Sequence, residues 1–198
     1  ALVLVVTGLA QLAFGASLSA AIVALATLAS YVIIYTPLKR VSHWAALVGA
    51  VPGALPVVIG WAAVAPVSLG AWSLCAVVFI WQLPHFLALT WMYRNDFAQA
   101  GLPLLSVVDP TGGRTSTHLL VYCALLIPVS LMPTWAGVAG IAYAIGAGGL
   151  TLGLLGVGIW FTRERSIARA RTLFLATLLY LPLVWTLLLV DLAGQSTR

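Results

Sequence analysis

No Asp, Glu, Lys or Arg lies between Arg40 and Arg94, and this uncharged stretch is the strongest constraint on the fold of the chain. A membrane-spanning helix needs about 20 consecutive apolar residues. The stretch has room for two such helices, with a turn near Ala65 and Pro66. A backbone in lipid must satisfy its own hydrogen bonds, and these apolar runs are long rather than alternating. We therefore predict α-helices and not a β-barrel.

The composition of the whole chain agrees with a membrane protein. Of its 198 residues, 63% are hydrophobic and 7% are charged, and the mean hydropathy is +1.12. A water-soluble domain carries about 25% charged residues to cover its surface. We therefore predict an all-α, polytopic transmembrane bundle in the lipid bilayer, with a single domain over residues 1–198. The net charge of +5 does not indicate nucleic acid, because basic residues in a membrane protein first report orientation.

Seven apolar runs are candidates for membrane helices. We predict helices near 1–14, 18–36, 44–65, 70–92, 115–132, 136–161 and 171–191. The first run begins at Ala1 with no charged segment before it, which argues against a signal peptide and suggests the remainder of a longer helix. Cys75 and Cys123 lie inside apolar runs without disulfide or metal-ligand spacing, so we expect both to pack as small core residues.

The positions of the basic residues predict a topology. With the loops between predicted helices numbered in order, Lys39 and Arg40 lie in the second loop, and Arg94 and Arg114 in the fourth. The sixth loop, FTRERSIARAR, contains the remaining arginines except Arg198. Because Lys and Arg collect in cytoplasmic loops, we expect these even-numbered loops in the cytoplasm or in the matrix of an organelle. The chain is then a multi-pass protein of the cell (inner or plasma) membrane.

The second loop, YTPLKRVSH, gathers Tyr35, Lys39, Arg40 and His43 at one helix end. Two interpretations fit this cluster. The adjacent Lys and Arg are an orientation signal whose side chains extend to the membrane interface, or they grip a phosphate-bearing group.

The fourth loop contains Asp96 and Asp109, two of the four acids in the chain. Long loops in compact proteins are often functional. Asp96 either forms a salt bridge with Arg94 or is a ligand for a hard cation such as Mg²⁺, which prefers carboxylate and phosphate oxygens. A single Asp is a poor metal site, so the second interpretation requires another acid from elsewhere.

The helix before this loop carries polar residues in the run WQLPHFLALTWMYRND. His85 lies roughly 13 Å deeper than Arg94, at about 1.5 Å of rise per residue. A polar side chain at that depth usually faces the bundle interior or a cavity. Either a neighbouring helix satisfies His85, or His85 and Gln82 form part of the wall of a substrate cavity, with Trp81 and Trp91 as apolar lining.

Several segments resemble one protein family. YTPLKRVS (35–42), GAVPGALPVVIGW (49–61) and WQLPHFLALTWMYRNDF (81–97), followed by AGLPLLSV (100–107), are similar to the protoheme IX farnesyltransferases, also called heme O synthases. The last apolar run, ARTLFLATLLYLPLVWTLLL (170–189), is similar to the last helix of that family. The family belongs to the intramembrane aromatic prenyltransferase superfamily.

The resemblance implies a bundle of nine helices around a lipid-accessible cavity, of which this chain has about seven and lacks the first two. It implies transfer of a farnesyl group from farnesyl diphosphate to a vinyl group of heme B, which gives heme O. In that superfamily two Asp-containing motifs hold Mg²⁺ on the diphosphate, and the first motif does not occur in this sequence. We therefore expect the isolated chain to be inactive. The resemblance also suggests a downstream heme-modifying enzyme or cytochrome oxidase assembly as a partner.

The resemblance implies a role for each matching residue. Asp96 matches the Asp of the second motif and is expected to bind Mg²⁺. Lys39 and Arg40 match a Lys–Arg pair that is expected to grip the diphosphate, with help from Arg94. His85 matches the histidine of the PHF motif and is expected to face the porphyrin or to position water near the vinyl carbon. The remaining predicted substrate-binding residues are Tyr35, Trp81, Gln82 and His43.

Three alternatives remain open. A prenyltransferase with a quinone or chlorophyll-type acceptor usually carries spaced Asp residues, whereas here Asp96 is followed four residues later by Ala100. The chain could be a small transporter or a structural subunit. An inverted repeat would favour a transporter, and we find none in the sequence. A haem-binding subunit without transferase activity needs facing axial ligands, and the spacing of His43, His85 and His118 does not provide such a pair.

Overall fold

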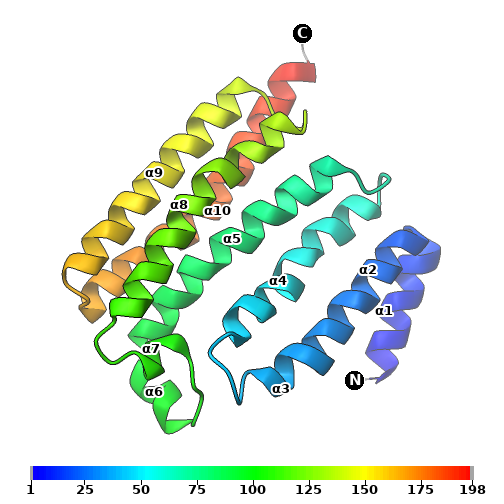
Figure 1. The fold of residues 1–198 in the computed structure, drawn as a ribbon. Helices are drawn as coiled ribbons and strands as arrows, with labels where there is room; N and C mark the ends of the chain where they lie inside the picture. The colour runs from blue at the N-terminus through cyan, green and yellow to red at the C-terminus, as the bar shows by residue number, and fades with distance from the viewer. Residues whose placement is uncertain (1, 197–198) are drawn as a thin grey trace.

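The structure, a computed structural model, describes residues 2–196 and consists of packed helices (Figure 1). The longer helices are α1 (Leu2–Gly15), α2 (Leu18–Ala29), α4 (Ala45–Ala62), α5 (Leu69–Met92), α8 (Gly113–Trp135), α9 (Ile141–Arg163) and α10 (Ile167–Ser196). The shorter elements are the π-helical turn η1 (Ser30–Tyr35), α3 (Thr36–Leu38), α6 (Arg94–Gln99) and α7 (Leu105–Val108). Residues 2–196 contain no β-strand, which confirms the predicted all-α class.

Six helical segments of the described chain are long and apolar enough to cross a membrane. Five of them are α4, α5, α8, α9 and α10, and the sixth is the continuous segment Leu18–Leu38 formed by α2, η1 and α3. The α1 helix is apolar as well, but its 14 residues are fewer than the roughly 20 that a spanning helix needs. The predicted multi-pass membrane protein is therefore confirmed, and the predicted run 1–14 corresponds to this shorter helix.

The predicted helix boundaries differ from the structure at both ends of the bundle. At the opposite end, α9 begins at Ile141 and not near residue 136, and α10 continues beyond residue 191; the basic end differs as well. There, α10 begins at Ile167 and not near residue 171, because Ser166 Oγ accepts the Arg169 N–H in the first turn. The segment FTRERSIARAR is therefore largely helical, with charged turns that extend α9 and α10 beyond their apolar parts. The short helices α6 and α7 were not predicted, because they lie outside the apolar runs.

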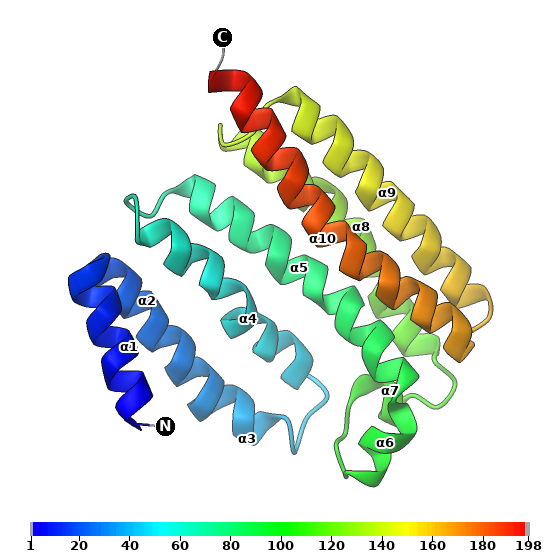
Figure 2. The same ribbon diagram turned by 180° about the vertical axis from the view of Figure 1, so that it is seen from behind.

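The α5 helix lies at the centre of the fold. It packs against α4, α8 and α10, and α9 packs against α8 and α10. On the other side, α2 packs against α4, and α1 packs against α2, so that these helices form a row (Figures 1 and 2). The main core lies among α5, α8, α9 and α10 and includes Tyr143, Phe161 and Leu119. Cys75 and Cys123 are buried and free, as predicted.

The connections that carry basic residues lie together at one end of the bundle, which we call the basic end. Figure 1 shows the α3–α4 connection, α6, α7 and the α9–α10 turn at its lower end. The α4–α5 and α8–α9 connections and the C-terminus lie at the opposite end. This arrangement agrees with the alternation of loops predicted from charge, because successive spanning helices return the chain to the same end.

Candidate substrate cavity

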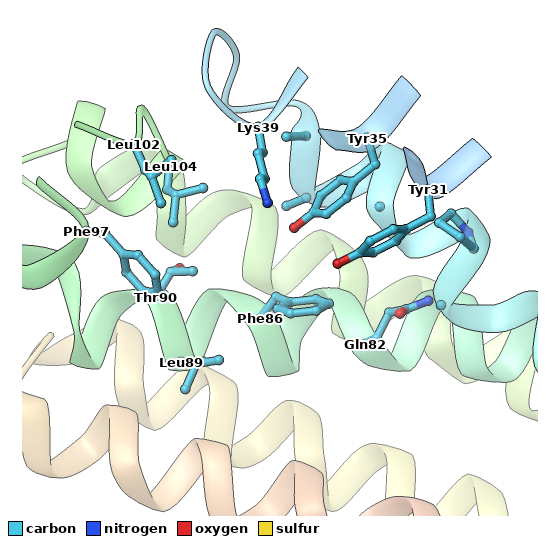
Figure 3. Close-up of a pocket in the computed structure, with 15 residues that line it drawn as sticks. Tyr31, Tyr35, Lys39, Gln82, Phe86, Leu89, Thr90, Phe97, Leu102 and Leu104 are labelled. Carbon is cyan, nitrogen blue, oxygen red and sulfur yellow. The ribbon is translucent and has the colours of Figure 1, made fainter. Parts of the chain in front are cut away.

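A cavity of about 510 Å³ lies between η1, α3, α4, α5 and the α6–α7 segment (Figure 3). Pockets for small molecules usually measure about 300–1,000 Å³. The lining side chains that Figure 3 labels are Tyr31, Tyr35, Lys39, Gln82, Phe86, Leu89, Thr90, Phe97, Leu102 and Leu104. Among the described residues that line this cavity, Lys39 is the only charged one. The cavity therefore suits a ligand with a long apolar part and one anionic end.

The π-helical turn η1 directs two tyrosines toward the cavity. The backbone N–H and the hydroxyl of Thr36 both donate to the Tyr31 carbonyl, the hydroxyl at 2.9 Å. Such π-helical turns are rare and occur frequently at functional sites. The ring centroids of Tyr31 and Tyr35 are 5.1 Å apart, and Figure 3 shows both hydroxyls on the cavity side. Lys39 Nζ lies 5.7 Å from the centroid of the Tyr35 ring, so the polar groups gather at one wall.

Two glycines of α4 allow side chains from η1 and α5 to approach its backbone. A Cβ atom at Gly49 would lie 2.6 Å from Cε2 of Tyr35, and one at Gly53 would overlap Oε1 of Gln82. Gln82 is buried, and its Nε2 donates to the Ala50 carbonyl at 2.7 Å. Any larger residue at Gly49 or Gly53 must displace one of these cavity-lining side chains. The motif GAVPGALP therefore shapes the cavity, because Gly49 and Gly53 have no side chain and leave room for Tyr35 and Gln82.

Asp96 is not part of the wall of this cavity. It is exposed on α6, next to the lining residue Phe97. The guanidinium of Arg94 lies over the Trp91 ring, 4.6 Å from its centroid. Within residues 2–196 the Arg94 side chain forms no salt bridge with Asp96, so that alternative does not describe the structure.

Asp96 differs from the other acids of the chain in having no side-chain partner among residues 2–196. Asp109, Glu164 and Asp191 are paired with Thr115, Arg169 and the Gly140 N–H, respectively. No described residue donates a hydrogen bond or an ion pair to the Asp96 carboxylate. The part of the chain that the structure describes has no group of three or more His, Cys, Asp or Glu side chains able to hold a metal. Within the described part of the chain, Asp96 is thus an unpaired, exposed carboxylate that directly precedes the lining residue Phe97.

Asp109 anchors the loop to the start of α8. Its Oδ2 accepts the N–H and the hydroxyl of Thr115 at 2.7 and 3.0 Å, and its Oδ1 accepts the hydroxyl of Thr111 at 3.1 Å. Burial by itself would raise the pKa of the Asp109 carboxyl, but these hydrogen bonds outweigh it and hold the pKa below its usual value. This second acid of the loop therefore has a structural role.

Trp91 and Arg165 fix the place where the loop enters α8. Trp91 Nε1 donates to the Arg165 carbonyl at 2.9 Å, and Arg165 donates to Ser116 Oγ and to the Thr111 carbonyl. Between them lies Gly112, whose φ is +72° and where a Cβ atom would overlap the Trp91 ring. Trp91, predicted as cavity lining, is 3% exposed and supports this junction instead.

Trp81 and His85 lie on the side of α5 that packs against α10. His85 Nδ1 is 2.9 Å from Thr177 Oγ1, and the Trp81 Nε1–H donates to the Thr177 carbonyl at 2.8 Å. The imidazole stacks between Trp81 and Phe174, with centroid distances of 5.2 and 4.7 Å. His85 is therefore satisfied by a neighbouring helix, one of the two alternatives predicted for it.

Helical geometry explains why the pair Gln82 and His85 does not share the cavity wall. At about 3.6 residues per turn, Gln82 and Phe86 lie on one face of α5, whereas Trp81 and His85 lie on an adjacent face. The expectation of a shared cavity wall holds for Gln82, which lines the cavity, but not for His85. Since α5 is apolar on almost all sides, its sequence does not indicate which face meets the cavity.

Arg40 and His43 lie at the basic end but outside this cavity. Arg40 is exposed, and His43 lines a small pocket of about 30 Å³ with Trp44, His118 and Tyr122. The predicted residues that the structure brings together around the cavity are Tyr35, Lys39 and Gln82, whereas Arg94 and Asp96 do not line it.

The lining residues that sequence reasoning missed include Tyr31, Phe86, Thr90 and Phe97. A helical spacing of four was the available signal for three of them. Tyr31 precedes Tyr35 by four residues, and the spacing from Gln82 to Phe86 and on to Thr90 is also four.

A membrane-embedded helix bundle with an apolar cavity and a cationic rim is the kind of protein that these observations define. The profile of the UbiA prenyltransferase family matches residues 1–191. The chain therefore belongs to the UbiA prenyltransferase family, which confirms the resemblance found in its motifs.

Curated relatives of the chain carry the name protoheme IX farnesyltransferase. The chain is 43% identical to the protein of Solibacter usitatus over 190 residues, which are 96% of this chain and 65% of the relative. It is 43% identical to the Salinibacter ruber protein, over 81% of this chain and 57% of the relative. It is 36% identical to the mitochondrial protein of Arabidopsis thaliana, over 97% of this chain and 45% of the relative. The chain thus spans less than two thirds of the length of these relatives. No solved structure matches it significantly.

Proposed function

We propose that this chain forms the substrate cavity of a protoheme IX farnesyltransferase, which moves a farnesyl group from farnesyl diphosphate to a vinyl group of heme B and yields heme O. One observation carries the proposal: the apolar cavity has Lys39 and Tyr35 at its rim and is also lined by Phe97, the residue that follows Asp96 in the chain. The farnesyl chain lies along Phe86 and Leu89, and the diphosphate lies at the basic end. The names of the relatives agree with this acceptor and this donor.

The side chains at the rim stabilise the departing diphosphate. Lys39 Nζ donates hydrogen bonds to phosphate oxygens, and the hydroxyls of Tyr31 and Tyr35 donate to the same group. A preorganised cation aimed at developing negative charge is the main means by which such a site lowers a barrier. Arg40 and Arg94, at the same end of the bundle, add to the positive field that attracts the anionic substrate.

Asp96 is the residue that would hold Mg²⁺. Its carboxylate is exposed, and no residue within 2–196 pairs with it. Mg²⁺ usually binds through one or two carboxylates together with substrate phosphates and water. When bound with the diphosphate, the ion would neutralise part of the charge of the leaving group.

The apolar wall protects the reactive farnesyl group. Cleavage of its C1–O bond leaves an allylic cation, and the vinyl group of heme B attacks C1 to form the new C–C bond. Water then adds to the resulting porphyrin-side cation and loses a proton, which gives the hydroxyl. Early access of bulk water would quench the allylic cation, so the site must stay dry until the C–C bond has formed. The ring faces of Tyr31, Tyr35 and Phe86 offer cation–π stabilisation to that cation.

The charge pattern supports an orientation for this reaction. We infer that the basic end faces the cytoplasm and that the protein resides in the cell inner membrane. Farnesyl diphosphate then enters from the aqueous side and heme B from the bilayer. Heme O would leave toward a downstream heme-modifying enzyme or cytochrome oxidase assembly.

Heme O formation in variants tests the proposed roles. The protein is expressed from its complete reading frame in cells that lack other heme farnesyltransferases. We expect Lys39→Ala and Asp96→Ala to lower heme O formation about 100-fold or more, as loss of an electrostatic group in an active site does. The control is Arg171→Ala, which removes an exposed cation of α10 and leaves activity unchanged. Wild-type activity in Lys39→Ala would contradict the role of the cavity rim.

A further inference from the structure

The cavity extends from the basic end into the membrane-spanning part of the bundle. On α5 its lining residues run from Thr90, close to the end of the helix, back to Gln82. At about 1.5 Å of rise per residue, Gln82 lies about 12 Å deeper than Thr90. On α4, which begins at the basic end, the deepest lining residue is Gly53. Figure 3 shows Gln82 on the side of the cavity away from Leu102 and Leu104, so Gln82 and Gly53 mark its deep end.

Beyond this deep end, α4 and α5 pack directly against each other. A buried cluster between the two helices consists of Ala54, Val58, Cys75 and Val78. Within it, Cys75 Sγ lies 3.5 Å from the carbonyl oxygen of Ala54. Val78 precedes Gln82 by four residues and therefore lies on the same face of α5, one turn deeper. Gln82 thus lies at the border between the cavity and the packed core.

The backbone of α4 holds the Gln82 side chain at this border. Gln82 is 6% exposed, and its Nε2 donates to the Ala50 carbonyl at 2.7 Å. Its Oε1 lies so close to Gly53 that a Cβ atom there would overlap it. A ligand that extends deeper must displace the amide and break this hydrogen bond. Because a buried polar group without a partner is costly, the Gln82 amide resists displacement more than an apolar side chain of similar size would.

We propose that Gln82 is the floor of the cavity that limits the length of the prenyl chain, and that Ala50 and Gly53 keep it in place. The inference rests on the proposed function, which makes a prenyl diphosphate the donor. With the diphosphate at Lys39, the chain extends along Phe86 toward Gln82, so its distal isoprene unit meets the amide. The floor discriminates against a longer donor, because that donor has to displace a buried, hydrogen-bonded group. Geranylgeranyl diphosphate, one isoprene unit longer than farnesyl diphosphate, is the donor that it disfavours.

Competition between two donors in one reaction tests the proposal. The full-length protein in nanodiscs receives heme B with equal concentrations of farnesyl and geranylgeranyl diphosphate, and mass spectrometry gives the ratio of the two products. Because both donors compete for the same protein, this ratio reports their relative kcat/KM and not the amount of folded protein. We expect the wild type to favour farnesyl, and Gln82→Ala to shift the ratio toward the longer chain about 10- to 100-fold. An unchanged ratio in Gln82→Ala would overturn the proposal.

Two further variants separate the floor from other effects of cavity size. Leu102→Ala removes a lining side chain of similar size at the basic end and should leave the ratio of the two products unchanged. Gly53→Ala should displace the Gln82 amide into the cavity, because the buried cluster lies on its other side. Geranyl diphosphate, one isoprene unit shorter, should then gain on farnesyl diphosphate about 10-fold. Equal shifts in Leu102→Ala and Gln82→Ala, or an unchanged preference in Gly53→Ala, would contradict the role of this floor.

Donor binding in the absence of heme separates this inference from the proposed function. The affinities for farnesyl and geranylgeranyl diphosphate are compared in the wild type and in Gln82→Ala. A relative affinity that shifts toward the longer donor in Gln82→Ala, in a protein that forms no heme O, would remove the proposed function and leave the floor standing. Heme O formation with the same donor preference in the wild type and in Gln82→Ala would overturn the floor alone.

Discussion

Gly49→Ala is the sharpest single perturbation of the cavity. The added Cβ atom would lie 2.6 Å from Cε2 and 2.7 Å from Cδ2 of Tyr35. Carbon atoms in ordinary contact are about 3.5–4.0 Å apart, so the ring must retreat by about 1 Å. Overpacking of this size costs about 1–3 kcal/mol, and misplacement of a substrate-positioning group by about 1 Å can lower activity about 100-fold. We therefore expect kcat/KM for farnesyl diphosphate to fall about 30- to 100-fold.

The matched control for this substitution lies on the same helix. A Cβ atom at Gly60 meets nothing within 4 Å, so Gly60→Ala should change neither activity nor stability appreciably. Heme O is measured by reversed-phase chromatography of membrane extracts over a range of farnesyl diphosphate concentrations, and folding by thermal melting in detergent. In a Tyr35→Ala background, Gly49→Ala should have little further effect, because the ring it displaces is gone. A Gly49→Ala protein with wild-type kcat/KM would refute the positioning role of Tyr35.

Three further substitutions test the rim and the loop. Lys39→Arg keeps a positive charge but changes its geometry, so it should retain more activity than Lys39→Ala at saturating farnesyl diphosphate. Equal activities of Lys39→Arg and Lys39→Ala would contradict a role based on charge. Asp109→Asn should lower the melting temperature at neutral pH. The folded-state pKa of Asp109 lies below its unfolded value of about 3.9, so the stabilisation by the Asp109 carboxylate is full above that value and is lost as the pH falls through the folded-state pKa. The difference in melting temperature between wild type and Asp109→Asn should therefore shrink below about pH 4. A difference that stays constant with pH would refute this role of the carboxylate. Gly112→Ala should destabilise the protein more than Gly101→Ala, since both have positive φ but only Gly112 contacts the Trp91 ring, and equal melting temperatures would contradict that contact.

The topology was predictable because lipid excludes charge. Lys39, Arg94 and Arg163 mark the ends of apolar runs, and the helices of the structure begin or end close to each of them. The two site residues near the second loop, Tyr35 and Lys39, were predicted in the same way, from the end of an apolar run. Tyr35 and Lys39 lie on the last turns of a spanning segment, and both line the cavity.

The directions of side chains around each helix were not predictable in the same way. Depth follows from the rise along a helix, so His85 was expected deep in the bundle, but its rotation about α5 depends on packing against α10. The turn η1 is a second example, since its π-helical backbone, which carries Tyr31 and Tyr35, leaves no pattern in the apolar run. Contacts between distant segments, such as Trp91 with Arg165, determine the position of the loop between α5 and α8.

The identity of the reaction product tests the central claim most directly. Membranes from cells that express the complete reading frame, with no other heme farnesyltransferase, are supplied with heme B and farnesyl diphosphate, and the extracted products are identified by mass spectrometry. We expect a heme that has gained one farnesyl group and one hydroxyl, formed by the wild type and lost in Lys39→Ala. Unmodified heme B together with a farnesylated quinone precursor would contradict the assignment of heme as the acceptor.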